Sequence, residues 1–152
     1  MSIHLSTGLR EALLGTDCWK ALFTDGIMDI YSGVIPANAD AIETGTLLVS
    51  ITVASGAFVA DAPENGLEFD APSGGTISKN GDTWSGEGVV TAEAGWYRFY
   101  DNGYDTGASA TAIRFDGTCA EGGGGDLNMA DLTVTQSATK EIDSFVITLP
   151  AY

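Results

Sequence analysis

Hydrophobic and polar residues alternate in short runs along most of this chain, and glycine, asparagine or aspartate separates the runs. Such runs, bounded by turn-forming residues, are typical of β-strands. The clearest run is Thr46–Val53 ("TLLVSITV"), and Ile142–Leu149 is expected to form another central strand. The other expected strands are Ile27–Tyr31, Leu67–Phe69, Thr76–Ser78, Thr83–Ser85, Gly88–Ala92, Trp96–Tyr100, Thr111–Phe115 and Leu132–Thr135. Because repeated crossover helices are missing, the pattern predicts an all-β fold, an antiparallel, jelly-roll-like β-sandwich of about 8–10 short strands.

Helical periodicity is confined to the start of the chain. Ser6 or Thr7 can cap a short helix that ends at Gly15, and Asp17 can cap a second turn. The second turn, Cys18–Phe23, places three apolar side chains on one face, namely Trp19, Leu22 and Phe23. We therefore divide the chain into a helical arm or lead-in (residues 1–25) and a single β-sandwich domain (residues 26–152). The three apolar side chains either anchor the arm on a partner or cover the open end of the sandwich.

Composition narrows the possible partners. The chain has 152 residues, of which 44% are hydrophobic, and its length fits one domain with one core. Its 21 acidic and six basic residues give a net charge of −15, which would repel a nucleic acid. No apolar run approaches the roughly 20 residues that span a bilayer, and Met1–Leu14 lacks the apolar centre of a signal peptide. We expect a protein made in the cytoplasm, with two free cysteines and with neither nucleic acid nor membrane as a partner.

Two arginines stand out in the predicted hairpin "GWYRFYDNGYDTGASATAIRFDG", which runs from Gly95 to Gly117. Alternation places Tyr97 and Phe99 on one face of the first strand, and Trp96, Arg98 and Tyr100 on the other. Arg114 lies opposite Ile113 and Phe115 in the second strand. With a symmetric loop the two arginines would lie near each other, so a carboxylate such as Asp101 or Asp116 is needed close by.

Two interpretations of these arginines stay open at this stage. In the first, each guanidinium lies along an aromatic ring and meets a carboxylate of the same domain. In the second, the side chains form a patch that docks on an adjacent subunit, because Trp, Tyr and Arg often dominate protein interfaces. The patch would consist of Trp96, Arg98, Tyr100 and Arg114.

Motifs that carry chemistry are missing from the sequence. His4 is the only histidine, and the nucleophile-elbow, zinc-protease and phosphate-loop patterns do not occur. The stretches "DNGYD" (Asp101–Asp105) and "DLNMAD" (Asp126–Asp131) lack calcium-loop spacing and are interpreted as turns. "EGGGGD" (Glu121–Asp126) is interpreted as a flexible hairpin tip, and Pro36–Gly45 as a solvent-facing connection. We predict no catalytic residue, no cofactor and no metal site.

The order of several segments resembles a group of small virion proteins of tailed bacteriophages and prophages. These segments, which cover nearly the whole chain, are "GLREALLG" (Gly8–Gly15), "DIYSGVIPANADAIETGTLLVSIT" (Asp29–Thr52), "WYRFYD" (Trp96–Asp101), "TAIRFDGT" (Thr111–Thr118), "DLNM" (Asp126–Met129) and "IDSFVITLPA" (Ile142–Ala151). The resemblance implies a virion structural protein with a compact β domain, located in the phage particle. It implies no catalytic residue.

An acidic single-domain β protein without fibrous repeats suits a capsid decoration or cement protein. Such a non-enzymatic protein binds the assembled shell and stabilises it by mass action. The expected partners are the major capsid protein or other virion proteins, with copies arranged as a homo-oligomer or symmetric array. The alternatives are a head–tail connector, a tail- or fibre-associated protein, or a carbohydrate-binding adhesin module. The adhesin would use exposed aromatic side chains, for which the candidates are Trp84, Trp96, Tyr100 and Tyr104.

Overall fold

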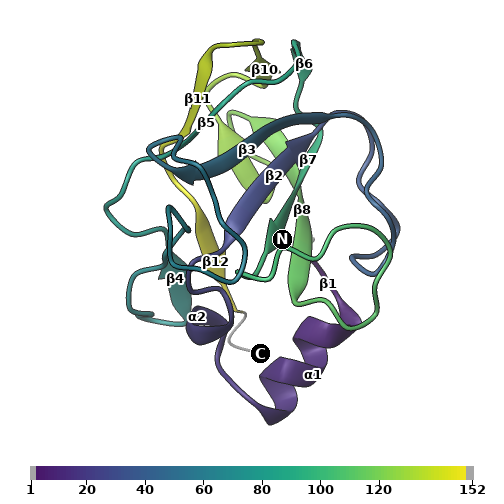
Figure 1. Ribbon diagram of the computed structural model, residues 1–152, viewed down its shortest axis with the longest axis vertical. Helices are drawn as coiled ribbons and strands as arrows, with labels where there is room; N and C mark the ends of the chain where they lie inside the picture. The colour runs from purple at the N-terminus through teal and green to yellow at the C-terminus, as the bar shows by residue number, and fades with distance from the viewer. Residues whose placement is uncertain (1–2, 150–152) are drawn as a thin grey trace.

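The computed structural model describes residues 3–149 and has an all-β, sandwich-like fold with two short helices near the start of the chain (Figure 1). This confirms the predicted fold class. The elements are β1 (His4–Leu5), α1 (Thr7–Gly15), α2 (Trp19–Leu22), β2 (Ile27–Tyr31), β3 (Leu47–Val53), β4 (Thr76–Ser78), β5 (Trp84–Glu87), β6 (Ala92–Glu93), β7 (Trp96–Tyr100), β8 (Arg114–Glu121), β9 (Leu127–Met129), β10 (Thr133–Val134), β11 (Thr139–Ile142) and β12 (Val146–Thr148).

One large sheet organises the molecule. Its strand order is β1-β8-β7-β2-β3-β5-β11, with neighbours antiparallel, and β9 adds to β8 in parallel. Two small antiparallel sheets, β4 with β12 and β6 with β10, complete the strands of the described chain. Figure 1 shows β4, β12 and both helices at one end of the molecule, and β6 and β10 at the other.

The two faces of the large sheet differ sharply in chemistry. Cross-strand pairing places one apolar row on the core face, running Ile51, Met28, Phe99, Phe115 and Leu5 from β3 to β1. The next row, on the opposite face, is polar and runs Ser50, Asp29, Arg98, Asp116 and His4 across the same five strands. Because side chains alternate across a strand, a shift of one residue would exchange the two rows. The register is therefore fixed by burial on both faces.

Aromatic side chains fill the core between the large sheet and the β4–β12 pair. Phe145 lies at their centre, with ring centroids 5.4 Å from Tyr97, 6.2 Å from Phe99 and 6.4 Å from Phe115. Ile77 of β4 and Ile147 of β12 belong to the same buried cluster. The small sheet therefore supplies the second layer of the sandwich over this part of the core.

The helical lead-in packs against this core. Ser6 caps α1, as predicted, because its hydroxyl accepts a hydrogen bond from the Leu9 N–H at 3.1 Å. In the second turn Phe23 is fully buried, and the Trp19 ring lies 4.9 Å from Phe115. Leu22 is partly buried against the same cluster. These contacts match the interpretation in which the lead-in covers one end of the sandwich.

Two expectations about strands and turns need correction. Ile142–Leu149 is not one central strand, because the chain breaks at 143–145, where Phe145 enters the core while Asp143 and Ser144 stay exposed. Its first part, β11, forms an edge of the large sheet, and its second part, β12, pairs with β4. Glu121–Asp126 is not a hairpin tip, because β9 runs parallel to β8. The positive φ angles of Gly122, Gly123 and Gly124 allow this return of the chain.

The expected strands Ile27–Tyr31, Thr76–Ser78 and Trp96–Tyr100 form with the predicted bounds, whereas others are shorter or shifted. Leu67–Phe69 makes isolated bridges, and Gly88–Ala92 contributes only its last residue to β6. The second hairpin strand, predicted at Thr111–Phe115, begins at Arg114 and continues to Glu121. The register consequently pairs Arg98 with Asp116, and Tyr100 with Arg114, so the two arginines do not oppose each other.

Candidate functional site: a charged network beneath two loops

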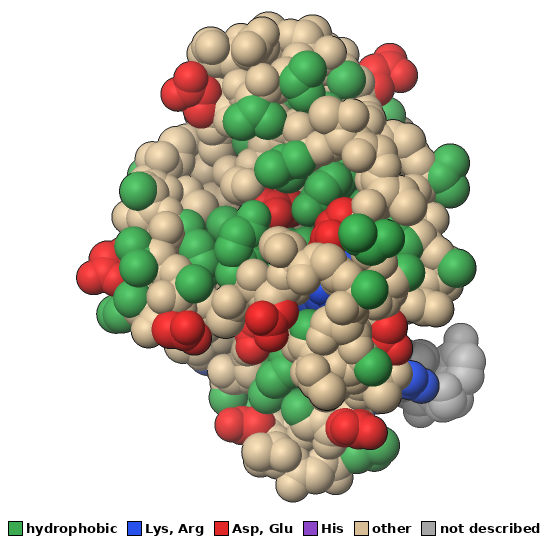
Figure 2. All heavy atoms as spheres, turned by 45° about the vertical axis from the view of Figure 1, so that its right-hand side comes forward, with side chains coloured by type: hydrophobic (Ala, Val, Ile, Leu, Met, Phe, Trp, Pro, Cys, Tyr) green, Lys and Arg blue, Asp and Glu red, His purple; other side chains and the backbone are tan. Residues whose placement is uncertain are grey.

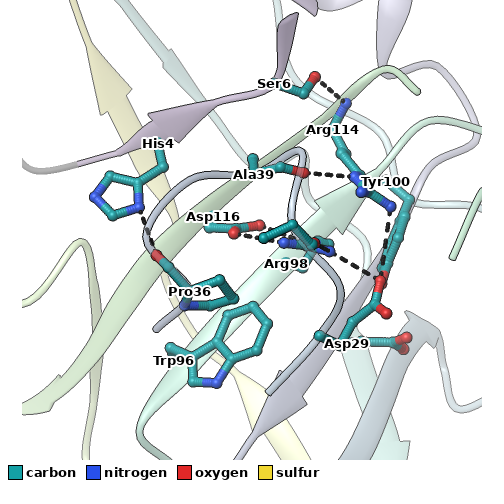
Figure 3. Close-up of polar contacts among 12 residues, drawn as sticks. His4, Ser6, Asp29, Pro36, Ala39, Trp96, Arg98, Tyr100, Arg114 and Asp116 are labelled. Atoms are coloured by element: carbon teal, nitrogen blue, oxygen red, sulfur yellow. Dashed lines mark hydrogen bonds and ion pairs between the residues drawn. The ribbon is translucent and has the colours of Figure 1, made fainter. Parts of the chain in front are cut away.

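The polar face of the large sheet holds a buried charged network centred on Arg98 (Figure 3). The Arg98 guanidinium donates two hydrogen bonds to Asp116, from Nε at 2.6 Å and from Nη2 at 2.7 Å. Its Nη1 donates to the Ala41 carbonyl at 3.0 Å and to Glu43 Oε1 at 2.9 Å. Trp96 lies beside it, with the ring centroid 5.5 Å from the guanidinium carbon. Arg98 and Asp116 are both 0% exposed, so each depends on the other for its charge balance.

Arg114 is buried as well, but it contacts mainly backbone oxygens. Its Nε donates to the Ala39 carbonyl at 2.7 Å, and its Nη1 to the Asp105 carbonyl at 2.7 Å. A longer contact of 3.6 Å joins Nη1 to Glu43 Oε1. Burial lowers the pKa of Arg114, and the nearby positive charge of Arg98 adds to this effect. Arg114 therefore ties two loops to the sheet.

The two loops are the covering segment (residues 34–45) and the β7–β8 loop (residues 101–113). Glu43 joins them, because its carboxylate accepts from Arg98, from the Tyr100 hydroxyl at 2.8 Å and from the Gly107 N–H at 2.9 Å. Asp40 reaches the start of α1, where it accepts from the backbone N–H and the hydroxyl of Thr7, both at 2.7 Å. The expectation of a solvent-facing connection at 36–45 was only partly right: half of its residues are exposed, but its inner side binds the buried arginines.

Asp29 sits next to this network, and no cation of residues 3–149 lies within ion-pair distance of it. It accepts hydrogen bonds from three hydroxyls: Ser50 at 2.5 Å, Tyr104 at 2.8 Å and Tyr31 at 3.3 Å. Burial raises the pKa of Asp29, and these hydrogen bonds oppose the rise. Burial likewise raises the pKa values of Tyr31, Tyr100 and Tyr104 well above the ordinary range, with the carboxylates nearby adding to the effect. The tyrosines therefore serve Asp29 and Glu43 as neutral hydrogen-bond donors.

The network is suited to holding structure rather than to reacting with a substrate. Arg98, Asp116 and Glu43 satisfy one another, and the Arg114 guanidinium is occupied by carbonyls. Within residues 3–149 no group of three or more His, Cys, Asp and Glu side chains could hold a metal ion. The acidic turns are used internally: Asp126 accepts from Thr118, and Asp131 from the Thr133 N–H. What the arrangement does is fix the covering segment and the β7–β8 loop on the sheet.

The structure places the residues proposed for docking in two environments. Trp96, Arg98, Tyr100 and Arg114 are each 0% exposed, so they form no surface patch in this chain. This corrects the expectation of a docking patch and matches the alternative in which a carboxylate of the same domain partners the arginine, with Asp116 as that partner of Arg98. Of the lead-in residues Trp19, Leu22 and Phe23, the first two keep partly exposed side chains.

Most of the aromatic side chains predicted to contact a carbohydrate are buried. Trp84, Trp96 and Tyr100 are 0% exposed. Tyr104 is only partly exposed, and its ring packs edge-on against Tyr100 with centroids 5.0 Å apart. Rings in these positions present no stacking platform to a sugar.

Sequence reasoning missed Asp29 and Glu43 as members of the network. The signal for Asp29 was a single carboxylate within the apolar run "IMDIY", where all five residues are buried. An unpaired carboxylate in such a run requires donors from neighbouring strands. Glu43 gave no comparable signal, because its segment is rich in alanine, asparagine and aspartate and looks like an exposed turn.

Asp101, at the start of the β7–β8 loop, is expected to make stability depend on pH. Burial raises its pKa to about 6, and Asp105 and Asp61 add to the rise. Because the folded state binds this proton more tightly than the unfolded chain, the stabilisation is present below about pH 4 and is lost as the pH rises to about 6. A rise of about two pKa units corresponds to about 3 kcal/mol at about 1.4 kcal/mol per unit, and solvent screening of this partly exposed carboxyl reduces the effect. Asp101→Asn should therefore gain stability relative to the natural protein between pH 4 and pH 7, by up to about 2 kcal/mol. Urea unfolding at several pH values measures this difference.

The matched control for this prediction is Asp143→Asn, which changes an exposed carboxylate. Its stability should follow the natural protein across the same pH range. If the Asp101→Asn curve also runs parallel to that of the natural protein, the assignment of the raised pKa to Asp101 is wrong.

Neither helix in the described part of the chain is long and apolar enough to cross a membrane. Comparisons with models of protein families, with curated proteins and with solved structures found no match to this chain.

Proposed function

We propose that this chain is a non-enzymatic structural protein of a tailed-phage virion, a capsid decoration or cement protein that binds the assembled shell. The observation that carries the proposal is that the buried charged side chains bind one another and nearby loops, and do not line an open site. The strongest candidates for chemistry, Arg98, Arg114, Asp116 and Asp29, are buried and serve to fix loops. What the molecule offers to its surroundings is a rigid surface. The resemblance of the segment order to phage virion proteins supports a tailed-phage particle as the location of the chain.

The surface is strongly acidic. Thirteen of the 21 acidic side chains are exposed. Figure 2 shows acidic side chains spread over the face in view, where basic side chains cover only small areas. Two of the six basic side chains are buried, and the Lys20, Lys79 and Lys140 amines donate to backbone carbonyls. Free copies therefore repel one another, which favours a soluble subunit until it meets a surface of complementary charge.

Mass action explains how such a subunit can stabilise a shell. A protein that binds the assembled shell, and not its separated subunits, shifts the equilibrium toward assembly by an amount set by its concentration and affinity. A symmetric shell offers many equivalent binding positions, and each occupied position adds the same stabilisation. Contacts that are weak individually can therefore stabilise the whole shell.

Copy number and shell stability test the proposal. Purified particles should contain on the order of hundreds of copies of the chain, as expected for a component repeated over a symmetric shell. Particles from a strain that lacks the gene should disrupt at a lower temperature, and added purified chain should restore the midpoint in a concentration-dependent way. About a dozen copies would indicate a connector or tail component instead. Absence of the chain from purified particles would overturn the proposal.

A further inference from the structure

An apolar groove lies at the helical end of the molecule, between the start of α2 and the β4–β12 sheet. It consists of two adjoining hollows of about 240 and 630 Å³. Both are lined by Cys18, Trp19 and Leu149. The first continues over Ile77 and Ile147 of the small sheet, and the second over Leu5 and α1 as far as Leu13, Leu14 and Gly15. The groove is thus continuous from β4 to the last turn of α1.

Two of the most exposed large apolar side chains of the described residues lie in the walls of the groove. Leu14 is 90% exposed and Leu149 is 65% exposed, and they rank first and third in exposure among the large hydrophobic side chains of residues 3–149. The Trp19 ring is partly exposed, whereas its indole N–H is buried and has no hydrogen-bond acceptor within the described residues. Large apolar side chains gathered around a hollow mark an interaction site more often than single exposed leucines do.

Charge decides what kind of partner fits. The groove contains one carboxylate, Asp17, and one ammonium group, Lys20, which donates to the Phe69 carbonyl. The chain as a whole has a net charge of −15, and two exposed carboxylates, Glu11 and Asp70, lie within a few residues of lining residues in the sequence. A second copy would bring the same negative charge to the contact and would be repelled. A segment with apolar side chains and flanking lysine or arginine gains from both features.

We infer that this groove is the surface by which the chain docks on its shell, and that it takes an apolar segment of the shell protein bordered by lysine or arginine. The inference rests on the proposed function. Leu14, Trp19 and Leu149 provide the apolar contacts, and the acidic surroundings attract the basic flanks. Docking on this groove leaves the charged network untouched, since that network lies on the opposite face of the sheet.

The test uses particles from the strain that lacks the gene, with purified chain added back and binding measured by co-sedimentation. Leu149→Glu and Leu14→Glu place a carboxylate in the groove at exposed positions, where folding is not at risk. We expect each to weaken binding at least tenfold, and binding of the natural chain to fall as salt is raised. Val89→Glu is the matched control, because Val89 is 55% exposed and follows β5 at the other end of the molecule. It should bind within about twofold of the natural chain, as expected for a surface change outside the contact.

Cys18 provides a second, independent test. It is exposed and lines both hollows, whereas Cys119 is only partly exposed and burial raises the pKa of its thiol to about 12. A bulky maleimide should therefore label Cys18 selectively and block docking. The Cys18→Ser chain, treated in the same way, should still dock.

The outcomes separate this inference from the proposed function. If the natural chain binds the particles and the groove variants bind equally well, the groove is not the docking surface and the cement function stands. If the natural chain fails to bind the particles at all, both proposals fall. If the natural chain is a dimer that Leu149→Glu dissociates, the groove joins copies of this chain and the inferred partner is wrong.

Discussion

Replacing Arg98 by alanine is expected to lower the free energy of unfolding by about 3–5 kcal/mol, because it leaves a buried carboxylate without its partner. Asp116 is 0% exposed and accepts two hydrogen bonds from this one guanidinium. Glu43 and the Ala41 carbonyl lose a donor in the same substitution. A loss of this size is a large part of the roughly 5–15 kcal/mol that stabilises a typical domain. Urea unfolding followed by circular dichroism measures the change in midpoint and slope.

Two variants distinguish the loss of charge balance from the loss of an arginine as such. Arg10→Ala removes an exposed arginine whose guanidinium donates to the Thr7 hydroxyl, and it should change stability by less than about 1 kcal/mol. Arg98→Met combined with Asp116→Leu removes both buried charges and should recover part of the loss. An Arg98→Ala chain as stable as the Arg10→Ala chain would show that the ion pair is not important for the fold.

The hairpin around Arg98 illustrates how far the sequence could predict this site. Strict alternation correctly placed Tyr97 and Phe99 on one face of the strand and Arg98 on the other, because that pattern depends only on strand geometry. The pairing partner depends on where the second strand begins. Arg114 is its first residue, three residues later than predicted, so Tyr100 pairs with Arg114 and Asp116 takes the position opposite Arg98.

The covering segment shows why the rest could not be predicted. Its small polar residues form turns in isolation, and nothing in their spacing reveals that their backbone carbonyls bind Arg98 and Arg114. Every residue has a backbone carbonyl, so the sequence does not indicate which carbonyls accept hydrogen bonds from a buried arginine. The buried arginines themselves were the available signal, because a buried guanidinium with five N–H groups requires several oxygens and one carboxylate cannot supply them all. The number of donors implied a covering loop, although not its identity.

The break between β11 and β12 has the same kind of cause. Residues 142–149 alternate well enough to predict one continuous strand, and Phe145 and Ile147 are buried as that pattern requires. The strand is interrupted between β11 and β12 because the Phe145 side chain packs at the centre of the core. There it contacts rings from four other segments of the chain. Local periodicity carries no information about which sheet a strand joins.

Phe145→Ala should therefore be among the most damaging single substitutions in the chain, with an expected loss of about 3–5 kcal/mol. The side chain is 2% exposed and contacts Trp84, Tyr97 and Phe115 of the large sheet from a position directly before β12. Its removal therefore leaves a cavity between the two layers that rigid strands cannot close. Leu149→Ala, four residues later and 65% exposed, should cost less than about 0.5 kcal/mol and provides the control. Thermal and urea unfolding of both variants measure the contrast. Equal stabilities would mean that Phe145 does not join the layers, and that the β4–β12 pair is held to the large sheet by Ile77 and Ile147 instead.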